Sequence, residues 1–265
     1  MVHGMRLQPH LAFRAVAQNF AQPDGGTLRV LDGIEFDVPA GRFVSVIGPS
    51  GCGKSTLLQM AAGLLFPTEG QVSHRGERIA AVNRDVGFVP QQAQLLPWKT
   101  LEENVAFPLA LRGVGLAERN KRAAAAIARV DLAGFEQHYP YQLSGGMQKR
   151  AAIARTLVYH PDVILMDEPF GALDAQTRMQ MQSDLQTLVA AEQATVLFIT
   201  HDITEAVLLS DRVVVLSRRP TRILAQVDVA LPRPRNMFEP FATPGFTDAY
   251  EAVWSVLRGV VGQAA

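Results

Sequence analysis

The chain has 265 residues, 48% of them hydrophobic, which is enough for a substantial folded core. Lys and Arg number 25 against 25 Asp and Glu, and this balance argues against a protein that binds nucleic acid over its whole surface. The longest stretch without charged side chains, residues 55–68, is too short to span a bilayer. Because Arg6, Pro9 and Arg14 interrupt the first apolar residues, no secretion signal is expected. Cys52 is the only cysteine, so we expect no internal disulfide and a reducing cytosol.

Glycine and proline divide the chain into alternating strand and helix patterns. An extended stretch and a turn at Asp24-Gly25-Gly26 come first, and strands are then predicted over residues 28–38, 42–47, 86–89, 163–166, 196–200 and 213–216. Helices are predicted after the glycine-rich loop that follows residue 47 and over residues 116–130, 147–159, 175–191 and 204–209. This alternation predicts an α/β fold with a mainly parallel sheet. Residues 95–155 should form a helical lobe, and after Pro220 only a short helix near residues 250–257 is predicted.

The segment GPSGCGKST, residues 48–56, fits the pattern G-x-x-x-x-G-K-[ST] between a predicted strand and a predicted helix. Glycines allow backbone N–H groups to turn inward around a phosphate, and the start of the helix adds its positive dipole end. Lys54 would reach the β and γ phosphates, and the Ser55 hydroxyl would bind Mg²⁺. The predicted phosphate-binding residues are Gly48, Pro49, Ser50, Gly51, Cys52, Gly53, Lys54, Ser55 and Thr56.

Two carboxylates follow the apolar strand at residues 163–166. Asp167 and Glu168 should lie at the carboxyl end of a buried strand, where ligands bind in open parallel sheets. Asp167 is suited to hold Mg²⁺, and Glu168 to polarise an attacking water. His201 and Gln91 also follow predicted strands, so His201 could contact the γ phosphate and Gln91 could reach Mg²⁺ or the water.

A second anion site is predicted at residues 143–148, LSGGMQ. Ser144 is the expected N-cap of a helix, and Gly145 and Gly146 would expose backbone N–H groups in its first turn. Two phosphate-binding helix starts in one chain indicate a nucleotide that is held from two sides.

In order and spacing, these residues resemble the ATP-binding subunit of an ABC transporter over roughly residues 10–260. Residues 48–56 match the Walker A motif, residues 143–148 the family signature and residues 170–174 (Phe170-Gly171-Ala172-Leu173-Asp174) the D-loop. Met147 departs from the Gln that the signature most often has there. The resemblance implies that Glu168, His201 and Gln91 are catalytic and that Ser55, Gln91 and Asp167 bind Mg²⁺. It also implies that Ser144, Gly145, Gly146 and Gln148 contact the partner's ATP and that Asp174 couples the dimer. Phe20 would stack on adenine, for which core packing is the alternative.

The resemblance also implies architecture and partners. We expect a RecA-like P-loop NTPase core, an N-terminal antiparallel β subdomain and a helical signature subdomain. The ATPase domain would cover residues 10–219, with the helical subdomain at about 95–155 inserted, and residues 220–265 would be a short C-terminal extension. The expected assembly is a homodimer with ATP and Mg²⁺ at its interface, bound to integral-membrane permease subunits at the cytoplasmic face of the membrane. A solute-binding protein would act indirectly, and no nucleic acid is expected.

A narrower resemblance comes from Leu95-Leu96-Pro97-Trp98, from LPRPR near residue 231 and from the late aromatic helix. These features are similar to the subfamily that imports nitrate, sulfonates, taurine and related small solutes. Leu95, Leu96 and Trp98 are expected either to dock on a membrane subunit or to pack against the helical lobe.

Three other classes of protein fit the sequence less well. ABC proteins of DNA repair carry a long coiled coil, and those of translation usually fuse two ATPase halves, whereas this chain has 265 residues and one Walker A motif. A small-molecule kinase should lack the signature and a carboxylate at Glu168. A structural P-loop module would not need the Asp167-Glu168 pair.

Overall fold

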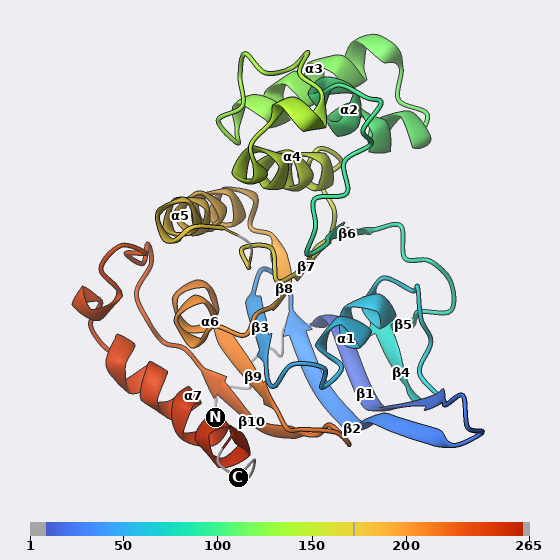
Figure 1. Ribbon diagram of the computed structural model, residues 1–265, viewed down its shortest axis with the longest axis vertical. Coiled ribbons are helices and arrows are strands. Elements are labelled where there is room, and N and C mark those ends of the chain that lie inside the picture. The colour runs from blue at the N-terminus through green and yellow to red at the C-terminus, as the bar shows by residue number, and fades with distance from the viewer. Residues whose placement is uncertain (1–8, 172, 262–265) are drawn as a thin grey trace, which may run out of the picture.

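The computed structural model describes residues 9–171 and 173–261, which form two sheets and a separate helical lobe (Figure 1). The four-stranded antiparallel sheet has the order β2-β1-β4-β5 and the six-stranded sheet the order β10-β9-β3-β8-β7-β6. The strands are β1 (Pro9–Ala21), β2 (Thr27–Pro39), β3 (Phe43–Ile47), β4 (Glu69–His74), β5 (Glu77–Arg78), β6 (Val86–Val89), β7 (Val163–Asp167), β8 (Thr195–Ile199), β9 (Arg212–Leu216) and β10 (Ile223–Asp228). The helices are α1 (Lys54–Ala61), α2 (Leu101–Leu111), α3 (Leu116–Ala128), η1 (Pro140–Gln142), α4 (Gly145–Leu157), α5 (Ala175–Glu192), α6 (Ile203–Leu209), η2 (Pro240–Ala242) and α7 (Phe246–Val261).

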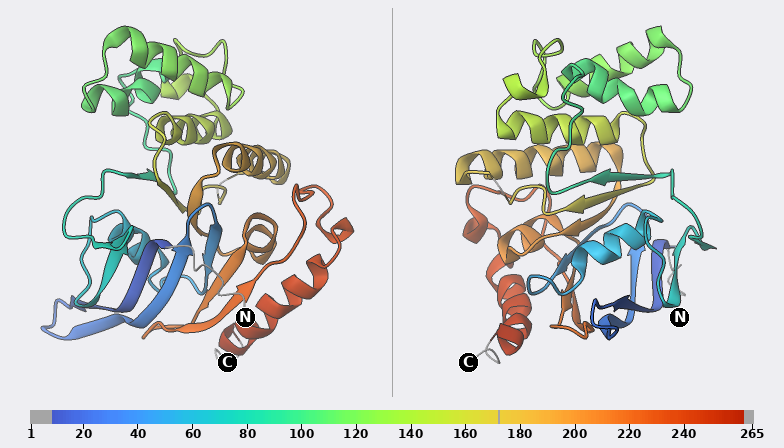
Figure 2. Two further views of the ribbon diagram at one scale, coloured as in Figure 1. Left: turned by 180° about the vertical axis from the view of Figure 1, so that it is seen from behind. Right: turned by 45° about the vertical axis from the view of Figure 1, so that its right-hand side comes forward.

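The predicted fold class is confirmed. Strands β6, β7, β8, β3 and β9 run parallel, and only β10 joins this sheet in the antiparallel direction. The antiparallel sheet at the N-terminus and the lobe of α2, α3 and α4 are also present (Figure 2). No helix within residues 9–171 and 173–261 is long and apolar enough to cross a membrane.

The central strands are mostly apolar because both of their faces are covered. In β3, Val44 and Val46 contribute to the core on the side of α1, whereas Phe43 and Ile47 contribute to the core on the side of α5, α6 and α7. Alternate side chains of a strand point to opposite faces, so a strand that is buried on both sides reads as a continuous hydrophobic run.

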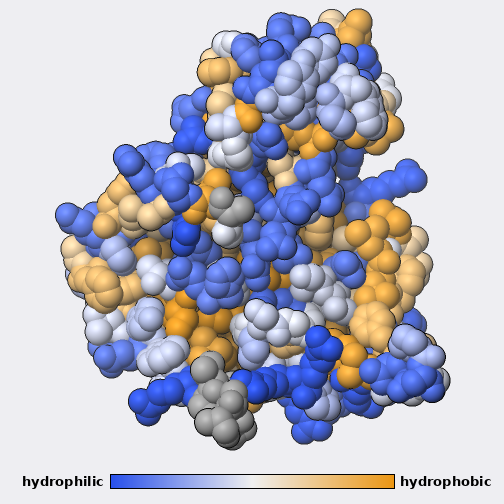
Figure 3. All heavy atoms as spheres, viewed as in Figure 1, coloured by the Kyte–Doolittle hydropathy of each residue, from blue (hydrophilic) through white to orange (hydrophobic). Residues whose placement is uncertain are grey.

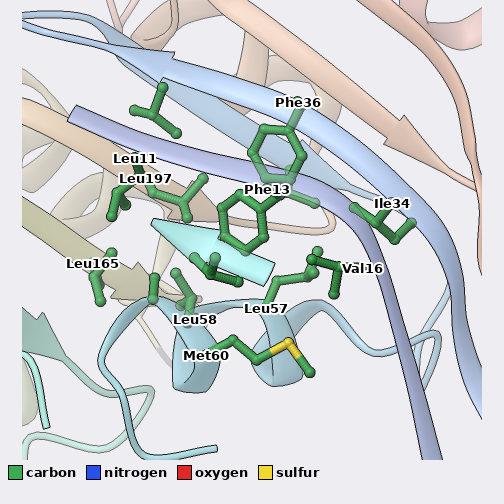
Figure 4. Packing of buried hydrophobic residues seen from close by; sticks show 14 of the residues in the cluster. Leu11, Phe13, Val16, Ile34, Phe36, Leu57, Leu58, Met60, Leu165 and Leu197 are labelled. Atoms are coloured by element: carbon green, nitrogen blue, oxygen red, sulfur yellow. The ribbon is translucent and has the colours of Figure 1, made fainter. Parts of the chain in front are cut away.

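Helix α1 is held between the two sheets. The rings of Phe13 in β1 and Phe36 in β2 stack at 4.4 Å between centroids, and Figure 4 shows them facing Leu57, Leu58 and Met60 of α1. All five side chains are buried, and burial of each such side chain stabilises the fold by about 1.5–3 kcal/mol. This packing fixes the helix whose first turn follows the glycine-rich loop.

The lobe of α2, α3 and α4 has a hydrophobic core of its own, which includes Leu101, Val105, Ile127 and Ala151. Thr100 caps α2 in a capping box with Glu103, so the lobe begins at a well-defined residue. Figure 2 shows the lobe at one end of the molecule, with α4 on the side nearest the sheets. The first turns of the signature helix thus belong to this lobe, whereas Ile153 and Thr156 further along α4 also contact the main sheet.

Strands β4, β5 and β10 were not predicted, and α7 is longer than the helix expected near residues 250–257. Strand β4 has the polar sequence EGQVSH, and β10 is only half-buried, so neither shows a strong apolar pattern. Strand β10 pairs with β9, and α7 contributes Phe246 and Val253 to the core beside α6. The segment 220–265 thus contributes a strand and a helix that pack on the main sheet.

Candidate functional site

The glycine-rich loop connects β3 to α1. Gly53, the N-cap of α1, has a φ of 106°, and a Cβ at this position would lie 2.8 Å from Val30 Cγ1, so only glycine fits. Because glycine has no side chain to cap the helix, the first N–H groups of α1 remain available to an anion. The Lys54 ammonium donates to the carbonyls of Gly48 at 2.9 Å and Pro49 at 3.1 Å, which places its charge inside the loop.

The Asp167 carboxylate lies beside the start of α1. The Ser55 side chain hydrogen-bonds to it, and burial raises the pKa of Asp167 although this hydrogen bond and the charge of Lys54 oppose the rise. Two oxygen donors from separate elements therefore meet next to the phosphate loop, and oxygen is the ligand type that Mg²⁺ prefers. The donor set fits Mg²⁺.

Glu168 and His201 come together at the ends of β7 and β8. His201 Nδ1 lies 3.1 Å from Glu168 Oε2, and the Glu168 N–H donates to the Ile199 carbonyl at 3.0 Å. Glu168 has a φ of 41°, an uncommon conformation for a residue other than glycine that is often found at active sites. The carboxylate is thus held at a defined place beside Asp167.

Gln91 follows β6, the neighbour of β7. The parallel register pairs Val89 with Met166, so Gln91 and Asp167 leave the sheet at the same edge. Gln91 is exposed there. The structure places it at the same edge of the sheet as the carboxylates, and its contact with Mg²⁺ or water stays a prediction.

The signature residues form the start of α4. Ser144 is the N-cap, as expected, and its Oγ accepts a hydrogen bond from the Met147 N–H at 3.3 Å. The Gln148 side chain donates to the carbonyls of Pro140 at 2.9 Å and Leu143 at 3.2 Å within its own chain, so it shapes the loop before the helix. Its predicted contact with a partner's ATP stays a prediction.

The D-loop meets the signature helix through α5. Asp174 caps α5 by accepting from the Thr177 N–H at 3.0 Å, and this hydrogen bond lowers the pKa of Asp174. A Cβ on Gly146 would lie 3.1 Å from Thr177 Cγ2, so the two helix starts touch. Ala172, also in the predicted D-loop, lies outside the described residues.

One connecting residue was missed by the sequence reasoning. Arg155 of α4 donates to the carbonyls of Ala93 at 3.0 Å and Gln94 at 2.9 Å, in the segment that follows Gln91. The signature helix is thereby tied to that segment. An arginine that bonds only to backbone carbonyls 61 and 62 residues away leaves no local sequence pattern.

The remaining predicted residues lie on the surface. Phe20 is partly exposed near the end of β1, and its stacking on adenine stays a prediction. Leu95 packs against the core of the helical lobe, which is the alternative role considered above, whereas Trp98 is 70% exposed. The loop that carries Trp98 is fixed by buried Asn104, whose side chain bonds to both the N–H and the carbonyl of Leu96.

The two anion-binding helix starts lie in different parts of the subunit. Helix α1 packs between the sheets, and α4 belongs to the helical lobe (Figure 1). The glycine-rich loop, Asp167, Glu168 and His201 lie around the start of α1 and the carboxyl ends of β3, β7 and β8, whereas the start of α4 does not belong to this group. This separation is what a nucleotide shared between two subunits requires.

Comparisons with known proteins agree with this geometry. The ABC transporter family profile matches residues 31–171. An uncharacterized ABC transporter ATP-binding protein of Methanocaldococcus jannaschii is 51% identical over 80% of this chain and 80% of its own length. An aliphatic sulfonates import ATP-binding protein of Bacillus cereus is 46% identical over 80% of this chain and 83% of its own length. A bicarbonate transport ATP-binding protein of Synechocystis is 44% identical over 86% of this chain and 34% of its own length.

A solved structure has the same fold. A dimeric ATP-binding cassette in a post-hydrolysis state, bound to ADP and Pi, is 34% identical, with a TM-score of 0.74 over 83% of this chain and 98% of that one. The glycine-rich loop follows β3 and Asp167 ends β7, within a fold that this solved cassette shares. The chain therefore belongs to the ABC transporter family and is one of its ATP-binding subunits.

Proposed function

We propose that the chain is an ATPase that powers the import of a small solute of the nitrate, sulfonate or taurine kind through separate membrane subunits. The observation that carries this proposal is the meeting of Ser55, Asp167, Glu168 and His201 around the phosphate loop. Relatives named as import ATP-binding proteins for aliphatic sulfonates, at 46% identity, support the direction of transport and the class of solute.

In this mechanism Lys54 and the first N–H groups of α1 bind the β and γ phosphates. Ser55, Asp167 and Gln91 would hold Mg²⁺, which would offset the charge of the phosphates when bound. Glu168 accepts a proton from the attacking water, and His201 holds the Glu168 carboxylate through its Nδ1 contact.

We infer that two copies close over ATP head to tail, each placing Ser144, Gly145 and Gly146 on the nucleotide of the other. The capped but glycine-rich start of α4 supports this arrangement, because its N–H groups can donate to a phosphate that the same subunit's α1 does not hold. ATP binding would then favour the closed dimer, and hydrolysis would reopen it.

The membrane partner would dock in a groove between the helical lobe and the main sheet. This groove has a volume of about 290 Å³ and is lined mainly by apolar side chains, among them the exposed Leu64, Val82 and Leu111. Hydrophobic side chains gather on that side of the molecule, over α1 and the segment between β5 and β6 (right-hand side of Figure 3). Such a surface fits an amphipathic helix of an integral-membrane subunit at the cytoplasmic face of the membrane.

Glu168→Gln tests the chemistry. It should keep Mg-ATP binding and slow hydrolysis by about 10²-fold or more, the usual effect of removing a general base. Light scattering after size exclusion should then show an ATP-dependent dimer. Glu77→Gln, an exposed change on β5, is the matched control and should hydrolyse ATP normally. A normal rate for Glu168→Gln would show that the role assignment is wrong.

Leu111→Glu tests the docking surface. Leu111 is 73% exposed at the end of α2, so the change should leave folding and ATPase activity intact. Co-sedimentation with membranes that contain the permease should be lost, whereas Leu224→Glu, an exposed change on β10, should co-sediment normally. Equal sedimentation of both variants would exclude the groove as the docking surface.

A further inference from the structure

The turn between β9 and β10 reaches the phosphate loop from outside. Arg219 Nε donates to the Gly51 carbonyl at 2.5 Å, and Thr221 Oγ1 donates to the Cys52 carbonyl at 2.6 Å. Thr221 is completely buried, whereas Arg219 is exposed. Two adjacent peptide groups of the loop are therefore held by a turn that lies 168 and 169 residues further along the chain.

The same turn is also anchored on the antiparallel sheet. The Thr221 N–H donates to the Val30 carbonyl, and its carbonyl accepts from the Asp32 N–H, both at 2.9 Å. Arg222 Nε donates to Asp32 Oδ2 at 2.7 Å. Residues 217–222 thus connect β2 of the antiparallel sheet, the main sheet and the phosphate loop.

The hydrogen bonds to the loop determine which way its N–H groups point. In a trans peptide the C=O and N–H bonds point in opposite directions, so a carbonyl held on the outside turns the next N–H inward. Holding the Gly51 carbonyl directs the Cys52 N–H to the Pro49 carbonyl, which it contacts at 3.3 Å to close the loop. Holding the Cys52 carbonyl directs the Gly53 N–H toward the phosphate position.

We propose that Arg219 and Thr221 are positioning residues for ATP: by holding the peptide groups after Gly51 and Cys52, they keep the loop closed and the Gly53 N–H directed toward the phosphate position before nucleotide arrives. This inference rests on the proposed ATPase function, because it names residues that prepare the same site. Fixing the donors in advance lowers the ordering cost of binding and so raises the affinity for ATP. Because the turn is bonded to β2, a shift of the antiparallel sheet moves the loop with it.

The chain contains a natural probe of how firmly the phosphate loop is held. Cys52 is the only cysteine, is buried, and lies between the two bonded peptide groups. Burial also raises the pKa of its thiol, against the opposing charges of Lys54 and Arg219. Its rate of labelling by a small disulfide reagent, measured without nucleotide, therefore reports how often the loop opens.

Thr221→Val removes the hydroxyl and keeps the shape. Loss of one buried hydrogen bond should speed Cys52 labelling roughly fivefold and weaken Mg-ATP binding by a similar factor, with kcat changed much less than KM. Thr221→Ser should restore both values because it keeps the hydroxyl. Arg219→Ala, an exposed change that should not impair folding, should act in the same direction, so the test does not depend on the folding of Thr221→Val.

Thr195→Val is the matched control. Thr195 is as buried as Thr221, and its Oγ1 accepts from the Gly41 N–H at 2.9 Å at the start of β8, the opposite end of that strand from His201. It should lower the thermal stability without changing Cys52 labelling or ATP affinity.

Unchanged labelling in both Arg219→Ala and Thr221→Val would overturn the inference, as would equal acceleration by Thr195→Val. The labelling assay contains no nucleotide, so it tests the positioning role of Arg219 and Thr221 independently of ATP binding and hydrolysis. Failure of the wild-type protein to bind Mg-ATP would instead count against the proposed function.

Discussion

A buried arginine holds the segment after β10 to helix α6. The Arg235 side chain is 3% exposed and bonds only to backbone carbonyls. Its Nη1 donates to Val207 at 2.8 Å, Leu208 at 3.2 Å and Ser210 at 2.7 Å, and its Nη2 to Val229 and Leu231 at 3.4 and 3.3 Å. Burial lowers the pKa of Arg235 to about 10, so the guanidinium is still charged at pH 7.

Arg235→Lys should destabilise the protein although it conserves the charge. A lysine ammonium is a single point and can serve the Nη1 carbonyls or the Nη2 carbonyls, but not both. If it keeps the shorter Nη1 bonds, the two long Nη2 bonds are lost, which together count as about one charged hydrogen bond of roughly 1.5–3 kcal/mol. We therefore expect the free energy of unfolding to fall by about 1.5–3 kcal/mol.

Urea unfolding followed by circular dichroism at pH 7 measures this loss. Arg233→Lys is the matched control, because Arg233 is partly exposed and bonds to the Leu209 carbonyl at 2.8 Å and Asp211 at 3.2 Å. It should cost less than about 1 kcal/mol. A loss for Arg235→Lys no larger than that of the control would refute the reasoning.

Three further predictions follow from local contacts. Burial raises the pKa of Glu205, so the stability that this carboxyl contributes is full below its ordinary pKa of 4.5 and is lost as the pH rises through the higher folded-state pKa. The stability of Glu205→Gln should therefore increase relative to wild type with rising pH, and a difference that is constant with pH would contradict this. Thr100→Ala removes the capping box of α2 and should cost about 1 kcal/mol in thermal unfolding, whereas Thr187→Ala, at an exposed position of α5, should cost less. Arg155→Met should raise amide hydrogen exchange in residues 93–98 and leave β6 protected; unchanged exchange would show that Arg155 does not hold that segment.

The site residues could be predicted where they follow buried strands. Strands β3 and β7 are mostly apolar because both of their faces are buried, so the change to polar residues marks where each strand ends. The polar residues that come next, such as Lys54 and Asp167, must then share one edge of a parallel sheet. This is why Ser55, Asp167, Glu168 and His201 could be expected to lie near the same edge of the sheet.

The residues that were missed act through long-range contacts. Thr221, Arg219 and Arg155 bond to backbone carbonyls, and a carbonyl has the same chemistry at every residue, so its partner leaves no sequence signature. Strand β10 was missed for a related reason. Its stability comes from pairing with β9 rather than from burial of its own side chains, which alternate between half-buried and exposed.

Strand β10 also has a consequence for the solubility of shortened chains. It covers the edge of β9, whose residues Val213 to Leu216 are fully buried. A chain that ended at residue 219 would leave this valine-rich edge with free N–H and C=O groups, which is the template on which strands of other molecules add. Such a truncated protein would lack the Thr221 hydrogen bond to the phosphate loop. It should also aggregate through β9 rather than remain dispersed.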